Sequence, residues 1–130
     1  MKTQLKNAAA IALIMMTMAS CGPAPTKVLP TPGPATTPFP IGVFAVTGWV
    51  LEFKADGTYV VQTDKLTESG PYTVTGNQVT LKGEQCNRLG IEKGVYIWNF
   101  DGKALTLKAI DDICMDRLSR IDGNTWAKKP

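Results

Sequence analysis

Few side chains in this sequence of 130 residues are suited to catalysis, and histidine is missing altogether. Without imidazole, Ser-His-Asp and Cys-His catalysis are excluded and the commonest zinc ligand is lacking. No phosphate-binding glycine loop occurs, because the glycines stand at turn positions. The acidic residues Asp111, Asp112 and Asp116 lack the spacing of a calcium loop and are expected in a solvated loop. We therefore expect no enzyme activity, no metal and no cofactor.

The three cysteines are the other chemically distinctive residues, and Cys21 follows a segment typical of export signals. Residues 1–20 begin with two lysines, continue with an apolar run over residues 8–18 that is too short to span a bilayer, and end in small residues. Residues 18–21 (Met-Ala-Ser-Cys) resemble the lipobox of bacterial lipoproteins, in which the cysteine is acylated before cleavage. This predicts a lipoprotein signal peptide over residues 1–20 and a lipid on Cys21. The alternative is an ordinary signal cleaved near Ala19, which leaves Cys21 as a free thiol.

The remaining two cysteines, Cys86 and Cys114, form an even pair in a chain expected to reach an oxidising compartment. A disulfide between them would close a loop of about 28 residues, worth about 3 kcal/mol in the chain-entropy model. Because a domain of this size buries a modest fraction of its surface, such a crosslink would matter for stability.

Two segments follow the predicted cleavage site. Residues 21–40 hold the lipidated cysteine and seven of the nine prolines, which favours an extended polyproline II linker of at most about 60 Å. From residue 41 to residue 130, short alternating runs are separated by glycine-containing turns, a pattern typical of a sandwich or barrel.

Three hairpins can be placed by register, because a slip of one residue would turn every apolar side chain to the wrong face. The turns are expected at residues 55–57, 76–77 and 101–102. The predicted partners are Phe53 with Tyr59, Tyr72 with Leu81, Val74 with Val79, Tyr96 with Leu107, and Trp98 with Leu105.

A final strand pair, residues 117–121 and 125–127, is expected around residues 122–124, and no stretch shows a convincing helical period. Consecutive one-sided hairpins predict an all-β domain, a small antiparallel up-and-down barrel of about eight strands, whose closure removes the two exposed edges.

Four segments carry a resemblance to bacterial lipocalin-like domains, which belong to the calycin group of up-and-down barrels. These are residues 53–59 (FKADGTY), 70–74 (GPYTV), 96–98 (YIW) and 112–117 (DICMDR), and the resemblance covers residues 45–127. It implies an eight-stranded barrel that holds a small apolar ligand.

Arg117 and Arg120 lie near the end of the chain, where calycin barrels often place an arginine over an aromatic ring of the first strand. The resemblance implies that Arg117 forms such a structural clasp with Trp49, a cation–π contact worth about 0.5–2 kcal/mol. The alternative is that an arginine points into the barrel and receives a ligand carboxylate.

Aromatic residues with polar tips form a stripe along the predicted strands: Tyr59, Tyr72, Tyr96 and Trp98. Together with Arg117 they are the candidate ligand-binding residues. The alternative is that they fill the core, since an eight-stranded barrel is just wide enough to be filled by side chains or to hold one small ligand.

The charge of the domain excludes some partners. The chain carries a net charge of +3, but residues 41–130 hold eleven basic and eleven acidic residues without a basic run. Nothing in this balance favours nucleic acid, and the lipid alone would hold the chain on the membrane.

The expected protein is therefore a monomeric lipoprotein, anchored to the membrane and facing the cell surface or periplasm. Its barrel is expected to bind a small apolar or amphipathic ligand. The alternatives are a protein-binding module, such as a protease inhibitor, and a structural envelope protein without a ligand.

Overall fold

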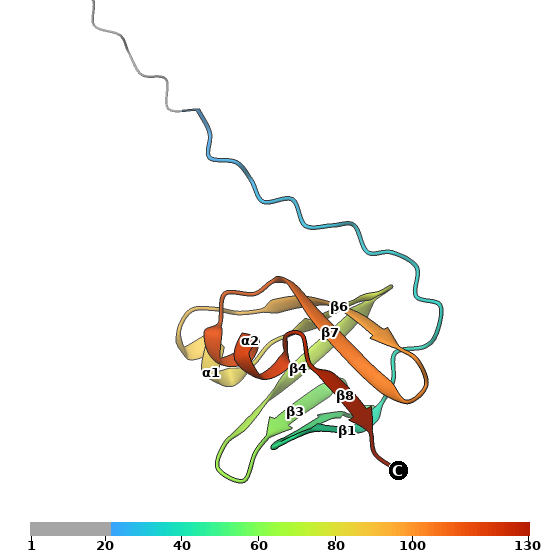
Figure 1. Ribbon diagram of the computed structural model, residues 1–130. Helices are drawn as coiled ribbons and strands as arrows, with labels where there is room; N and C mark the ends of the chain where they lie inside the picture. The colour runs from blue at the N-terminus through green and yellow to red at the C-terminus, as the bar shows by residue number, and fades with distance from the viewer. Residues whose placement is uncertain (1–21) are drawn as a thin grey trace, which may run out of the picture.

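The computed structural model describes residues 22–130, so the predicted signal peptide and the predicted lipid site at Cys21 lie outside the described residues. Eight antiparallel strands form a closed barrel in sequence order, with β1 pairing to β8 (Figure 1). The elements are β1 (Gly42–Val46), β2 (Trp49–Phe53), β3 (Thr58–Gln62), β4 (Thr67–Thr75), β5 (Gln78–Leu81), α1 (Glu84–Arg88), β6 (Gly94–Phe100), β7 (Ala104–Asp111), α2 (Met115–Ile121) and β8 (Thr125–Lys128). The predicted all-β, up-and-down barrel is confirmed.

Two of the three predicted hairpin registers are confirmed. In the first hairpin Phe53 faces Tyr59, and in the second Tyr72 faces Leu81 and Val74 faces Val79. Each turn contains a glycine with a positive φ, Gly57 at 82° and Gly76 at 55°, a conformation that other residues rarely adopt.

The third register, between β6 and β7, differs from the prediction by two residues. Trp98 pairs with Leu107 instead of Leu105, and Tyr96 pairs with Ala109 instead of Leu107. The turn lies one residue later than expected, because Asp101 Oδ1 accepts hydrogen bonds from the backbone N–H groups of Lys103 and Ala104 at 2.8 and 2.7 Å. A shift of two keeps every side chain on its predicted face.

The predicted strand over residues 117–121 is wrong, since these residues belong to helix α2, and the barrel takes β1 as its eighth strand instead. One face of α2 is buried through Arg117, Arg120 and Ile121, at the spacing of a helix. Because two of these three buried positions are arginines, the apolar residues of this segment do not repeat with the period of a helix, and the sequence pattern does not indicate one. Helix α1 has only five residues, and no helix within residues 22–130 is long and apolar enough to cross a membrane.

The two ends of the barrel differ in how they are covered. Helices α1 and α2 lie together at one end, here called the helical end (Figure 1). The β2–β3, β4–β5 and β6–β7 turns form the opposite end, here called the hairpin end. The chain enters β1 at the hairpin end from residues 22–40, here called the tether, which contain no helix or strand.

The interior between the two ends is filled with apolar side chains from seven strands and from α2, and Tyr72 of β4 packs against them. Fully buried rings are packed edge to face, as in Phe44 against Phe53. The buried cluster consists of Phe44, Leu51, Phe53, Tyr59, Val61, Val79, Leu81, Tyr96, Trp98, Leu105, Leu107, Ile121 and Trp126.

The predicted disulfide between Cys86 and Cys114 is confirmed. Cys86 lies in α1, and Cys114 is the residue that precedes α2, so the bond joins the two helices of the helical end. Both cysteines are buried.

Replacing Cys86 and Cys114 together with alanine is expected to lower the free energy of unfolding by about 3 kcal/mol, because the unfolded chain regains the freedom of a 28-residue loop. Urea unfolding followed by circular dichroism measures this. Dithiothreitol added to the wild type should give a similar loss and should leave the alanine variant unchanged. A variant as stable as the oxidised wild type would contradict the prediction.

Candidate functional site

An aromatic ring from outside the barrel lies at the hairpin end. Phe39, in the tether, packs its ring against three rings of the barrel, at centroid distances of 4.9 Å from Phe53, 5.5 Å from Tyr72 and 5.2 Å from Trp98. Phe53 ends β2, while Tyr72 and Trp98 lie near the ends of β4 and β6. We call these three barrel residues the mouth.

The polar atoms of the mouth are bound to the hairpin backbone. The Tyr72 hydroxyl donates a hydrogen bond to the Lys54 carbonyl at 2.9 Å, and Trp98 Nε1 donates one to the Gly76 carbonyl at 3.1 Å. Burial raises the pKa of Tyr72, so the hydroxyl keeps its proton at neutral pH. The rings therefore offer apolar surface to Phe39 while their donors hold the turns in place.

The helical end holds a buried polar group centred on Arg117 and Asp112, whose side chains are both fully buried. Arg117 donates hydrogen bonds to the two Asp112 oxygens at 2.6 and 2.9 Å, and the Tyr96 hydroxyl donates a third. Burial acts to raise the pKa of Asp112, but the bonds from Arg117, Tyr96 and the Cys114 backbone outweigh it, and this pKa lies below its usual value. Burial and the neighbouring Asp112 together raise the pKa of Tyr96.

A second buried ion pair joins Arg120 of α2 to Glu68 of β4, with Arg120 Nη1 at 2.8 Å from Glu68 Oε2. The Tyr59 hydroxyl lies 3.5 Å from the other carboxylate oxygen. Burial raises the pKa of Glu68, although the charges of Arg120 and Arg117 oppose the shift. Burial followed by the charge of Glu68 raises the pKa of Tyr59.

The clasp over Trp49 is made by Arg120 and not by Arg117. The Arg120 guanidinium carbon lies 5.5 Å from the centre of the Trp49 ring, whereas Arg117 is directed to Asp112. Arg117 and Arg120 lie one turn apart on the buried face of α2. Arg117 therefore reaches the barrel interior, and Arg120 reaches the rim.

The five predicted ligand-binding residues do not form one site. Tyr72 and Trp98 lie together at the mouth, where both contact Phe39. Tyr59, Tyr96 and Arg117 are fully buried and engaged with the acidic residues of the helical end. The mouth is thus the part of the predicted site that remains close to solvent.

The acidic residues near α2 have separate roles. Asp112 is buried against Arg117, contrary to the expected solvated loop, while Asp111 forms an exposed ion pair with Lys27 of the tether at 2.9 Å. Asp116 is exposed. Within residues 22–130 no group of three or more acidic or cysteine side chains could hold a metal ion.

Two residues of these sites were not anticipated from the sequence. Phe39 lies inside the proline-rich segment, and its signal is a large aromatic residue just before the domain. Glu68 lies in β4, outside the three predicted hairpins, and the polar residues around it carry no apolar alternation that could have marked it as buried.

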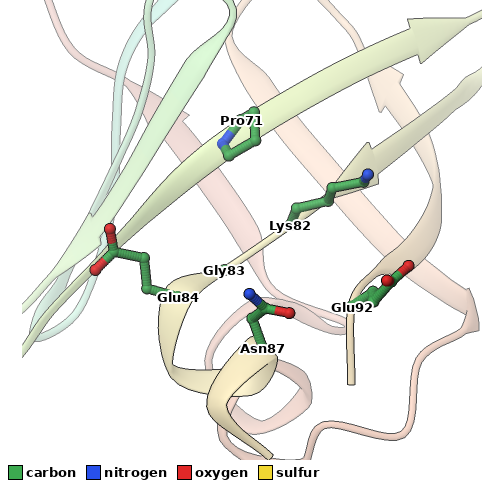
Figure 2. A pocket seen from close by; sticks show the side chains of 6 residues that line it. All are labelled: Pro71, Lys82, Gly83, Glu84, Asn87 and Glu92. Carbon is green, nitrogen blue, oxygen red and sulfur yellow. The ribbon is translucent and has the colours of Figure 1, made fainter. Parts of the chain in front are cut away.

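A shallow groove of about 280 Å³ lies beside α1 (Figure 2). It is lined by Pro71, Lys82, Gly83, Glu84, Asn87 and Glu92. Gly83 packs directly on the buried Glu68, because a Cβ there would lie 1.8 Å from Glu68 Oε1. The side chains of Lys82 and Glu84 point away from each other in Figure 2.

No family model, no curated protein and no solved structure matches this chain. The assignment of a function therefore rests on the geometry of the two ends of the barrel.

Substituting Asp112 with asparagine is expected to lower the free energy of unfolding by about 3–5 kcal/mol, because the Arg117 charge would stay buried without its partner. The adjacent Asp111→Asn substitution is the matched control. It removes the solvent-exposed pair with Lys27 and should cost about 0–1 kcal/mol. Urea unfolding of both variants measures the difference. An equal loss of the free energy of unfolding in both variants would contradict the prediction that the buried ion pair matters more than the exposed one.

Proposed function

We propose that this chain is an exported lipoprotein, anchored through Cys21, whose barrel binds a small amphipathic ligand at the mouth. The supporting observation is the ring of Phe39, which arrives from outside the barrel and lies among Phe53, Tyr72 and Trp98. A mouth that accepts this apolar group from the tether has the size and chemistry to accept a similar group from a ligand.

The mouth is favoured over the deeper interior because the deeper interior is already occupied. Tyr59 and Tyr96 have no exposed surface, and their hydroxyls face Glu68 and Asp112. A ligand placed there would have to break buried polar contacts, which costs far more than displacing one ring at the surface. The ligand is therefore one aromatic ring or a short acyl chain, not a long fatty acid enclosed by the barrel.

The rim of the hairpin end supports an anionic head group on this ligand. Lys103, Lys128 and Lys129 line one open cleft there. The Lys128 ammonium lies 5.5 Å from the Phe100 ring, and Phe100 is linked to Phe53 through Phe44 by edge-to-face contacts. Apolar rings beside ammonium groups suit a ligand with an apolar tail and a carboxylate or similar head.

The exposed apolar residues of the helical end favour a second candidate function, recognition of a protein partner. Leu89, Ile113 and Met115 are 69%, 71% and 73% exposed, and the Cys86–Cys114 disulfide brings their segments together. Gly90, Ile91 and Ile113 line one open cleft, which supports this proximity. Exposed apolar groups of this kind mark interaction sites. Loss of a secreted protease's activity on titration with the chain would favour this candidate.

The lipid anchor is tested by growing the host with an alkyne analogue of palmitate. Wild-type chain should take up the label, and Cys21→Ser should lose it, because the acylated thiol is gone. The double variant with alanine at residues 86 and 114 should keep the label. Equal labelling of the wild type and Cys21→Ser would overturn the proposed anchor.

Binding at the mouth is tested with decanoate, titrated by calorimetry into the chain purified from its host in detergent. Phe39→Ala should bind decanoate at least about 10-fold more tightly than the wild type, because the competing ring is removed. Decyltrimethylammonium should bind more weakly than decanoate to both chains.

Ile41→Ala serves as the matched control, because Ile41 is an apolar residue two positions beyond Phe39 whose side chain is exposed. It should leave the affinity for decanoate unchanged. Absence of binding to both the wild type and Phe39→Ala would overturn the proposed function.

A further inference from the structure

The tether is bound to the tip of the β4–β5 hairpin before it reaches the mouth. Gly33 N–H donates to Asn77 Oδ1 at 2.8 Å, and Asn77 N–H donates back to the Gly33 carbonyl at 3.0 Å. Gln78 Nε2 donates to the Pro30 carbonyl at 2.7 Å. Three hydrogen bonds thus hold a segment that was expected to be a free spacer.

The hairpin tip has a shape that fits the tether. A Cβ on Gly76 would lie 2.1 Å from the Gly33 carbonyl oxygen and 3.6 Å from the Pro32 side chain. The tip therefore depends on glycine at this position for two reasons, the positive φ of the turn and the close approach of the tether.

Residues 30–39 of the tether are held at two separate points, apart from the exposed Lys27–Asp111 ion pair further back in the tether. The hydrogen bonds to Asn77 and Gln78 form the first, and the Phe39 ring in the mouth forms the second. Between them, residues 34–37 border an open crevice of about 290 Å³ against β6. We call residues 30–39 the strap. Because the middle of the strap packs loosely, its attachment to the barrel depends on the contacts at its two ends.

We propose that the strap is released when a ligand enters the mouth, so that ligand binding lengthens the tether between the membrane and the barrel. This inference rests on the proposed function. Phe39 and the ligand compete for the same rings, and a strap that has lost Phe39 keeps only its contacts with the hairpin tip. The part of the tether that is not bound to the hairpin end then grows from residues 22–29, in which Lys27 forms an exposed ion pair with Asp111, to residues 22–40. At full extension this is a change from about 25 Å to about 60 Å.

The coupling is reciprocal, as thermodynamic linkage requires. If the ligand loosens the strap, then a substitution that loosens the strap must strengthen ligand binding, even where the substituted residue does not contact the ligand. Asn77 is such a residue, because its side chain accepts the Gly33 N–H and only its backbone carbonyl bonds to Trp98 of the mouth. A residue with a purely structural role in the barrel would have no such effect.

Hydrogen–deuterium exchange followed by mass spectrometry reports on the strap in the full chain as purified from its host. In the wild type, the peptide containing Gly33 and the peptide containing Asn77 should both be protected. Saturating decanoate should increase exchange in both, while peptides of β7 stay unchanged. Phe39→Ala should show the fast exchange without decanoate.

The affinity for decanoate supplies the second measurement. Asn77→Ala, which removes the side-chain acceptor of Gly33 and leaves the hairpin backbone intact, should bind decanoate about 2- to 10-fold more tightly. Asn99→Ala is the matched control, because Asn99 lines the same crevice with an exposed side chain. It should leave both the exchange and the affinity unchanged.

The possible failures are distinguishable. If decanoate binds but leaves the exchange of Gly33 and Asn77 unchanged, the strap inference is overturned and the proposed function stands. Protection of the Gly33 and Asn77 peptides from exchange that persists in Phe39→Ala overturns the strap inference as well, since the Phe39 ring would then not be the contact that holds the strap. If decanoate binds to neither the wild type nor Phe39→Ala, the proposed function fails and the coupling fails with it.

Discussion

Closure of eight short strands into one barrel is the constraint on which the rest of this structure depends. Because β1 pairs with β8, the closed barrel leaves no strand edge without a hydrogen-bonded neighbour. Closure also fixes the size of the interior, which side chains are just able to fill. Once rings such as Phe53 and Tyr96 occupy that interior, little room is left inside for anything else. Room for a ligand inside the barrel is thereby confined to the two ends, where the barrel must be covered by something other than a strand.

The helical end is covered by a rigid arrangement. Two arginines of α2 are paired with Asp112 and Glu68, and the disulfide joins α1 to the residue preceding α2. Buried ion pairs add little net stability over apolar side chains of the same size, but breaking one is costly, so they hold α2 in a single orientation. Gly94 shows how tightly this end is packed, since a Cβ there would lie 2.1 Å from Asp112 Oδ2.

Sequence reasoning succeeded where the physics is local. Alternating side chains and turn glycines such as Gly57 and Gly76 determine a hairpin within a few residues, and two registers followed from them. The β6–β7 register failed because the Asp101 carboxylate holds the turn one residue later, a choice between neighbouring turns that alternation does not resolve. Helix α2 was missed because its buried face carries arginines, which become core residues only when Asp112 and Glu68 are present to pair with them.

The candidate site required information that no local pattern contains. Alternation shows which face of a strand a residue occupies but not its depth along the barrel, so Tyr59 and Tyr96 could not be separated from Tyr72 and Trp98. The same limit applied to Phe39, because a proline-rich composition indicates an extended chain without indicating what that chain touches. Its contacts depend on residues that follow it by 14 to 59 positions, as the partners Phe53 and Trp98 show.

The contrast between the two ends suggests how the molecule divides its tasks. At the helical end, opening would require breaking a disulfide and buried ion pairs, which costs much free energy. The hairpin end is closed by one ring and by three hydrogen bonds with a segment that has no regular structure. A contact that is to exchange with a ligand has to be weak enough to be displaced. A strap with four prolines in ten residues loses little conformational freedom when it binds. A fold that is locked at one end and lightly closed at the other can therefore change its tether without unfolding its barrel.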